Sequence, residues 1–93
     1  MNEKYQKLYR ETREELIIFY NSFSEKPLPL TGPINLFRCS SPNEHNIEKY
    51  KLFVAYYSML EGNYESTEGL SDNERFNDLR RLVKEIKKAI KKV

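Results

Sequence analysis

The sequence predicts an all-α protein, a small three-helix bundle with a proline-rich extended strap between the first and second helices. Apolar residues recur at helical spacing in three separate segments, and a Ser-x-x-Glu capping pattern precedes the second and third of them. Three prolines fall within residues 26–33, between the first two segments. A chain of 93 residues has the size of one domain, so we expect a single helical domain over residues 1–93.

The first helix is predicted over about residues 2–24. When successive residues are placed about 100° apart, its apolar stripe occupies an arc of about 120°. The members of this stripe are Tyr5, Leu8, Tyr9, Thr12, Leu16, Phe19, Tyr20 and Phe23. Ile17 and Ile18 lie outside the arc, so the second half of this helix is apolar over most of its circumference.

The strap is predicted over residues 25–40. Its prolines remove backbone donors and force the preceding residues into extended conformations, which excludes a helix. The strap is nevertheless rich in apolar residues, namely Leu28, Leu30, Ile34, Leu36 and Phe37. We therefore expect it to lie across the helices and not to form a free linker.

The second helix is predicted over about residues 42–61. Ser41 suits the N-cap, Pro42 suits the first helical position, and Glu44 can close a capping box. Gly62 can take the left-handed conformation that ends a helix. One apolar stripe comprises Ile47, Tyr50, Phe53, Val54, Tyr57 and Leu60. A second stripe, spaced i, i+4, i+7, comprises Leu52, Tyr56 and Met59.

The third helix is predicted over about residues 72–92. Ser71 and Glu74 form its capping box. Its apolar residues alternate between spacings of three and four, which is typical of the packed seam of a helical bundle. They are Phe76, Leu79, Val83, Ile86, Ile90 and Val93.

The charge of the chain is unevenly distributed, because residues 80–93 carry seven Lys or Arg against one Glu, a net of +6. Residues 1–79 carry nine Lys or Arg against thirteen Asp or Glu, a net of −4. The seven cations fall within about 140° of the third helix, opposite its apolar seam. We call them the basic face: Arg80, Arg81, Lys84, Lys87, Lys88, Lys91 and Lys92. Such a stripe is typical of a surface that contacts the phosphates of DNA or RNA.

Two other interpretations of the basic face remain open. The first is a solvated face without a ligand, since cations in the last helical turn are favoured by the helix dipole. The second is a contact with an acidic protein or a membrane surface. A membrane is the weaker partner, because the chain has no Trp and the apolar seam is needed for the core. We therefore expect no membrane partner.

Apolar residues in excess of one core stripe predict a protein interface, either with a second copy or with another protein. The candidates are Ile17, Ile18, Leu52, Tyr56 and Met59. The alternative is that the strap covers them.

Signals for catalysis are few. Cys39 and His45 are the only thiol and the only imidazole, so a zinc site of these ligands is excluded. Arg38 and His45, with six residues between them, resemble the Arg-x4-6-His element of HEPN-type ribonucleases, but the rest of that family's pattern is missing. No glycine-rich phosphate loop is present. We expect no enzymatic activity, cofactor, metal or small-molecule substrate.

A single cysteine excludes an intramolecular disulfide, and the chain shows neither a signal-peptide pattern nor a long apolar segment. These features predict a cytoplasmic location. The function predicted is that of a non-enzymatic accessory subunit or regulator in nucleic-acid transactions. The alternative is a protein–protein interaction module, such as a small inhibitor or adaptor, that docks through its apolar residues.

Overall fold

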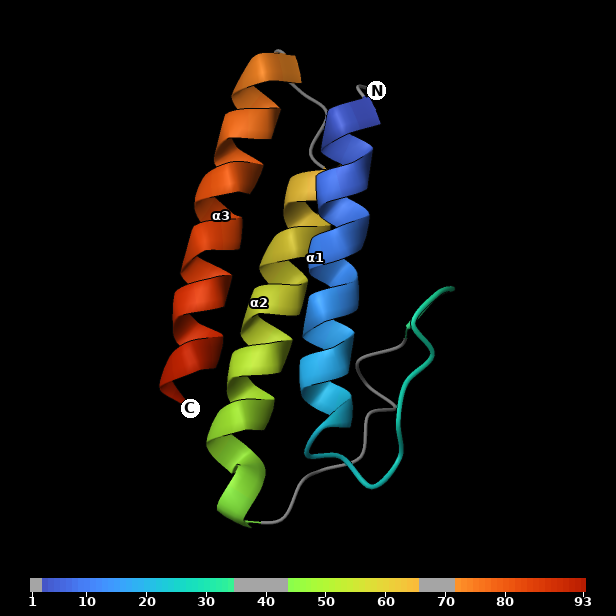
Figure 1. Ribbon diagram of the computed structural model, residues 1–93, viewed down its shortest axis with the longest axis vertical. Coiled ribbons are helices and arrows are strands. Elements are labelled where there is room, and N and C mark those ends of the chain that lie inside the picture. The colour runs from blue at the N-terminus through green and yellow to red at the C-terminus, as the bar shows by residue number, and fades with distance from the viewer. Residues whose placement is uncertain (1–2, 35–43, 66–71) are drawn as a thin grey trace.

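Three α-helices pack together in the computed structural model, which describes residues 3–34, 44–65 and 72–93 (Figure 1). They are α1 (Glu3–Asn21), α2 (Ile47–Glu65, preceded by the 3-10 turn η2, Glu44–Asn46) and α3 (Asp72–Lys92). Each helix packs against the other two, and the described residues include no strand. α1 and α3 run in the same direction and α2 runs in the opposite one. The predicted all-α, three-helix fold is confirmed.

The core lies between the three helices, on the faces that the apolar periodicity predicts. Tyr5 and Tyr20 of α1 and Phe53 of α2 are among the largest fully buried side chains. The rings of Tyr20 and Phe53 lie 4.8 Å apart between centroids and link α1 to α2. α3 contributes aliphatic side chains, namely Leu79, Leu82, Val83 and Ile86. Because α3 uses its apolar seam here, the basic face on the other side of that helix is turned to solvent.

α1 ends at Asn21, short of the end predicted near residue 24. The Asn21 side chain bonds both backbone groups of Leu28: its Oδ1 accepts from the amide at 2.7 Å, and its Nδ2 donates to the carbonyl at 3.0 Å. The next residues form a turn, in which the amide of Ser24 still donates to the carbonyl of Tyr20 at 3.0 Å. The side chain that ends the helix therefore also holds the chain that returns along it.

The part of the strap that the structure describes, residues 25–34, contains no helix and no strand. It folds back along α1, where the Arg13 guanidinium donates to the carbonyl of Leu30 at 3.1 Å and to the carbonyl of Gly32. Gly32 has a φ of 94°, in the left-handed region that glycine adopts without a steric penalty. Residues 35–40 of the predicted strap, which include Cys39, lie outside the described residues.

α2 extends beyond its predicted end, because it continues through Gly62 to Glu65. Contacts with α1 account for the extra turn: the Tyr5 hydroxyl donates to Asn63 Oδ1 at 2.5 Å, and the Tyr64 ring stacks on Tyr9 with centroids 4.2 Å apart. These contacts offset the cost of about 1 kcal/mol for a glycine inside a helix. The predicted start near residue 42, with its Ser41 cap, lies outside the described residues.

Arg75 joins the three helices near the start of α3. Its side chain is only 7% exposed, and its guanidinium carbon lies 5.1 Å from the centroid of the Tyr5 ring. It also donates a hydrogen bond to the carbonyl of Tyr64 at 2.8 Å, in the last turn of α2. The dipole of α2 stabilises a cation at this end of the helix. The hydrogen bond also satisfies one of the carbonyls that the last turn of α2 leaves without a partner inside the helix. α3 spans its predicted range, although its Ser71 cap lies outside the described residues.

Candidate nucleic-acid interface

All seven residues of the basic face are exposed on α3. Arg81 lies 3.9 Å from Asp78, and both of these side chains are open to water, so the pair contributes little stability. Within the described ranges, the five lysines of the face have no salt-bridge or hydrogen-bond partner. Like charges at i, i+4 cost about 0.2–0.5 kcal/mol per pair in an isolated helix. The surface therefore presents concentrated positive charge that its surroundings do not neutralise.

α1 extends this positive surface with two lysines that the sequence analysis did not include. Lys4 and Lys7 are exposed and lie across a groove from Arg80 and Lys84 of α3. Helical periodicity places Lys4 and Lys7 on one flank of α1, but it does not tell which helix lies beside that flank. Their proximity to α3 is a result of the tertiary packing.

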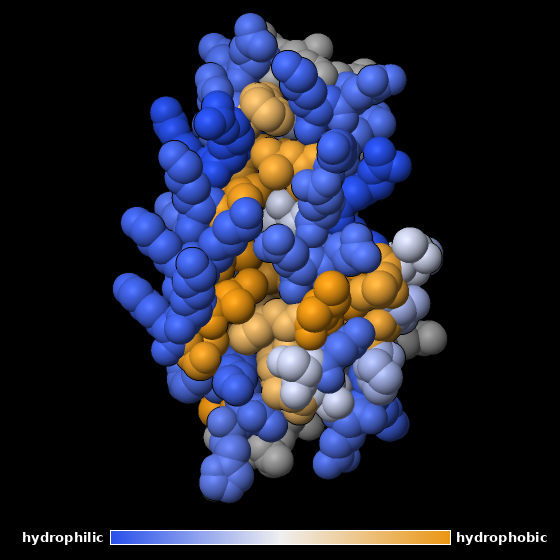
Figure 2. Space-filling view, in the orientation of Figure 1, coloured by the Kyte–Doolittle hydropathy of each residue, from blue (hydrophilic) through white to orange (hydrophobic). Residues whose placement is uncertain are grey.

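The α1–α3 groove has a volume of about 390 Å³ and an apolar floor between its charged rims. The floor consists of Leu8, Phe76 and Val83, which all pack against the core. Figure 2 shows a stripe of hydrophobic surface between α3 and α1, with hydrophilic side chains on either side. The Arg80 guanidinium lies 5.9 Å from the centroid of the Phe76 ring, so a cation and an aromatic ring meet at the edge of the groove.

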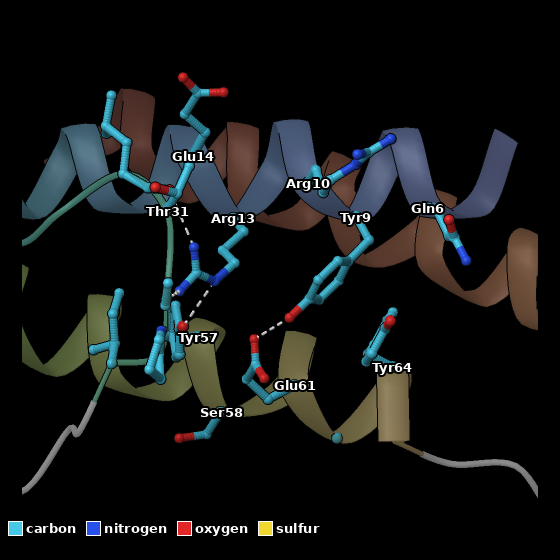
Figure 3. Close-up of a pocket in the computed structure, with 15 residues that line it drawn as sticks. Gln6, Tyr9, Arg10, Arg13, Glu14, Thr31, Tyr57, Ser58, Glu61 and Tyr64 are labelled. Carbon is cyan, nitrogen blue, oxygen red and sulfur yellow. Dashed lines mark hydrogen bonds between the residues drawn. The ribbon is translucent and has the colours of Figure 1, made fainter. Parts of the chain in front are cut away.

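A larger hollow of about 1080 Å³ lies on the other flank of α1, between α1, α2 and the strap (Figure 3). Four of its polar side chains bond to one another, and one of these, Arg13, also bonds to the strap. The Tyr9 hydroxyl donates to a carboxylate oxygen of Glu61, and Arg13 Nε donates to the Tyr57 hydroxyl at 3.0 Å. Burial, with the Glu61 carboxylate as a second cause, raises the pKa of Tyr9 well above its ordinary value of 10.0. The α1–α2 hollow is therefore the place where the strap is anchored.

The predicted protein-interface residues do not form one surface. Ile17 is fully buried in the core, so its assignment to an interface is wrong. Its side chain is covered because the other two helices pack against α1. Ile18 is 54% exposed and Met59 is 50% exposed, on α1 and α2 respectively. Leu52 and Tyr56 are half-buried. α1 therefore contributes one side chain to the predicted patch, and the remainder is a narrow stripe on α2.

The structure does not bring the residues considered for catalysis together within its described ranges. His45 is exposed in η2, and its proposed companions Cys39 and Arg38 lie outside that part. The described residues contain no group of three or more His, Cys, Asp or Glu side chains that could hold a metal ion. Among the same residues, no helix has the length and apolar character needed to cross a membrane.

Comparisons with protein-family models, with curated proteins and with solved structures found no match to this chain.

Proposed function

We propose that this protein is a non-enzymatic nucleic-acid-binding protein, an accessory subunit or regulator that contacts phosphates through the basic face of α3. The observation that supports this proposal is the exposure of all seven cations on one side of a helix whose opposite side forms the core. Mutual repulsion of these cations is relieved when phosphates replace water and counterions around them. The fold keeps the face accessible without any rearrangement.

The test is a titration of labelled DNA and RNA with the wild-type protein at several salt concentrations. We expect log K to fall linearly with log salt, by about 0.7–0.9 for each phosphate contacted. Absence of binding to both DNA and RNA at about 50 mM salt, where phosphate contacts are strong, would rule the proposal out.

A charge-matched pair of variants locates the interface. The first variant replaces four lysines of the basic face with Gln: Lys84, Lys87, Lys88 and Lys91. The control variant removes the same charge elsewhere, by Gln substitutions at Arg10, Lys26, Lys49 and Lys51. Binding should be lost in the first variant and largely kept in the second, because contacts and not net charge decide the affinity. Glutamine is used since Glu near the end of α3 would oppose the helix dipole.

A protein–protein interaction module is the second candidate, because Met59 is half exposed beside Leu52 and Tyr56 on α2. A pull-down from native lysate with and without nuclease separates the two. Partners that disappear after nuclease treatment support the nucleic-acid function. A defined protein that remains bound, and that a Met59→Lys variant loses, supports the module.

A further inference from the structure

The α1–α3 groove differs from the rest of the basic face in having cations on both sides. Lys4 and Lys7 line it from α1, and Arg80 and Lys84 line it from α3. Among the lining residues that the structure describes, Glu11 carries the one carboxylate, so these residues bear four positive charges and one negative charge. An occupant that complements this lining is anionic along its length.

The floor of the groove adds a second requirement. The Phe76 ring is partly buried and lies within cation–π distance of Arg80, and Leu8 continues the apolar surface on the α1 side. Unpaired nucleobases stack on aromatic rings and on arginine planes, and this contact does not depend on the base sequence. A duplex keeps its bases paired inside and presents its phosphates outward, so it would leave such a floor without a partner.

We propose that the α1–α3 groove binds single-stranded nucleic acid, with unpaired bases on the apolar floor and backbone phosphates on the lysines of the two rims. The inference rests on the proposed function and narrows it to one conformation of the nucleic acid. Successive cations on each rim stand about one helical turn, roughly 5 Å, apart. A flexible single strand can adjust its phosphates to that spacing. In this arrangement Lys88 and Lys92, at the far edge of the basic face, attract the nucleic acid electrostatically without contacting its phosphates directly.

Three labelled probes of equal length test the base contact: an oligothymidine of about 12 nucleotides, within the usual site sizes, its duplex with oligoadenine, and an abasic strand with the same phosphates. Their affinities for the wild-type protein are measured by fluorescence polarisation. We expect the oligothymidine to bind more tightly than the duplex. The abasic strand should bind at least about fivefold more weakly than oligothymidine, because stacking contributes to the affinity at each base contacted.

Two double variants with the same change of charge test whether the α1–α3 groove is the binding site. Lys7→Gln with Lys84→Gln removes one cation from each rim, and Lys88→Gln with Lys92→Gln removes two from the far edge. All four lysines are exposed, so both variants should fold. The first variant should lower the slope of log K against log salt by about 1.4, which corresponds to two phosphates of a single strand. The second should lower the slope by less than half as much.

The outcomes separate this inference from the function beneath it. If the wild-type protein binds none of the probes, the proposed function fails, and this inference fails with it. If single strand, duplex and abasic strand bind equally well, or both double variants lose affinity equally, the basic face binds phosphates but the groove is not a single-strand site. If a Glu-rich helical peptide binds and oligothymidine does not, and the Lys7 and Lys84 variant loses the peptide, the groove belongs to an acidic protein partner.

Discussion

The two flanks of α1 both carry cationic side chains, but these side chains make different contacts. On the α2 flank, Tyr9 and Arg13 bond to Glu61 and Tyr57, and Arg13 also holds the strap. On the α3 flank, exposed lysines surround an apolar floor, and Lys7 has no salt bridge within the described ranges. A ligand on the first flank would compete with the hydrogen bonds of Tyr9 and Arg13, whereas a ligand on the second flank could reach the exposed Lys7 side chain and the apolar floor. The larger hollow contains hydrogen bonds that join α1 to α2 and to the strap, whereas the smaller groove is the site that we propose for a ligand.

The largest effect is expected from weakening the α2 flank at its core. Tyr20→Ala removes a side chain that is 1% exposed and whose ring meets Phe53. The loss should be about 3–5 kcal/mol of unfolding free energy, as for other large aromatic residues in cores. Urea denaturation followed by circular dichroism measures it, with Tyr20→Leu as the milder control. A Tyr20→Ala protein within 1 kcal/mol of wild type would show that this contact does not hold α1 to α2.

A smaller effect is expected from the strap anchor. Arg13→Ala removes the hydrogen bonds to Tyr57, Leu30 and Gly32, and should cost about 1–2 kcal/mol. Amide hydrogen exchange in residues 28–34 should become faster. Arg10→Ala is the matched control, because Arg10 borders the same hollow one turn earlier and is exposed. Equal exchange rates in the two variants would mean that Arg13 is not the anchor.

Tyr9→Phe tests the single bond to Glu61 while keeping the stack on Tyr64. The expected loss near neutral pH is about 1 kcal/mol. Because the folded pKa of Tyr9 lies above the ordinary 10.0, its contribution is fully present below pH 10 and is lost as the pH rises above that value. The stability difference between wild type and variant should therefore shrink above pH 10, as measured by urea denaturation at a series of pH values. A stability difference that stays constant with pH would mean that folding does not raise the pKa of Tyr9.

The smallest effect on stability is expected on the α3 flank. The Lys7→Gln and Lys84→Gln double variant changes only exposed side chains and should stay within about 0.5 kcal/mol of wild type. The same denaturation experiment measures it. A loss as large as that of Arg13→Ala would show that the rim lysines stabilise the bundle, and would remove the contrast between the two flanks.

Sequence patterns were reliable where a single helix decides the outcome. The range of α3 and the exposure of Lys84 or Lys88 opposite Ile86 follow from a period of 3.6 residues, which needs no knowledge of the neighbours. The prediction that α2 ends at Gly62 was wrong, because glycine is only a weak local signal. Contacts of Asn63 and Tyr64 with another helix outweigh it.

The three helices and the division of α3 into an apolar side and a basic side follow from the sequence, because both depend on the spacing of residues along one helix. Which flanks of the helices meet is visible only in the folded bundle. Packing of the helices buried Ile17, directed Arg13 to the strap, and placed Lys4 and Lys7 across a groove from Arg80 and Lys84. The physical reason is that helical periodicity fixes the direction of each side chain around its own axis, whereas the neighbour in that direction depends on how the helices pack.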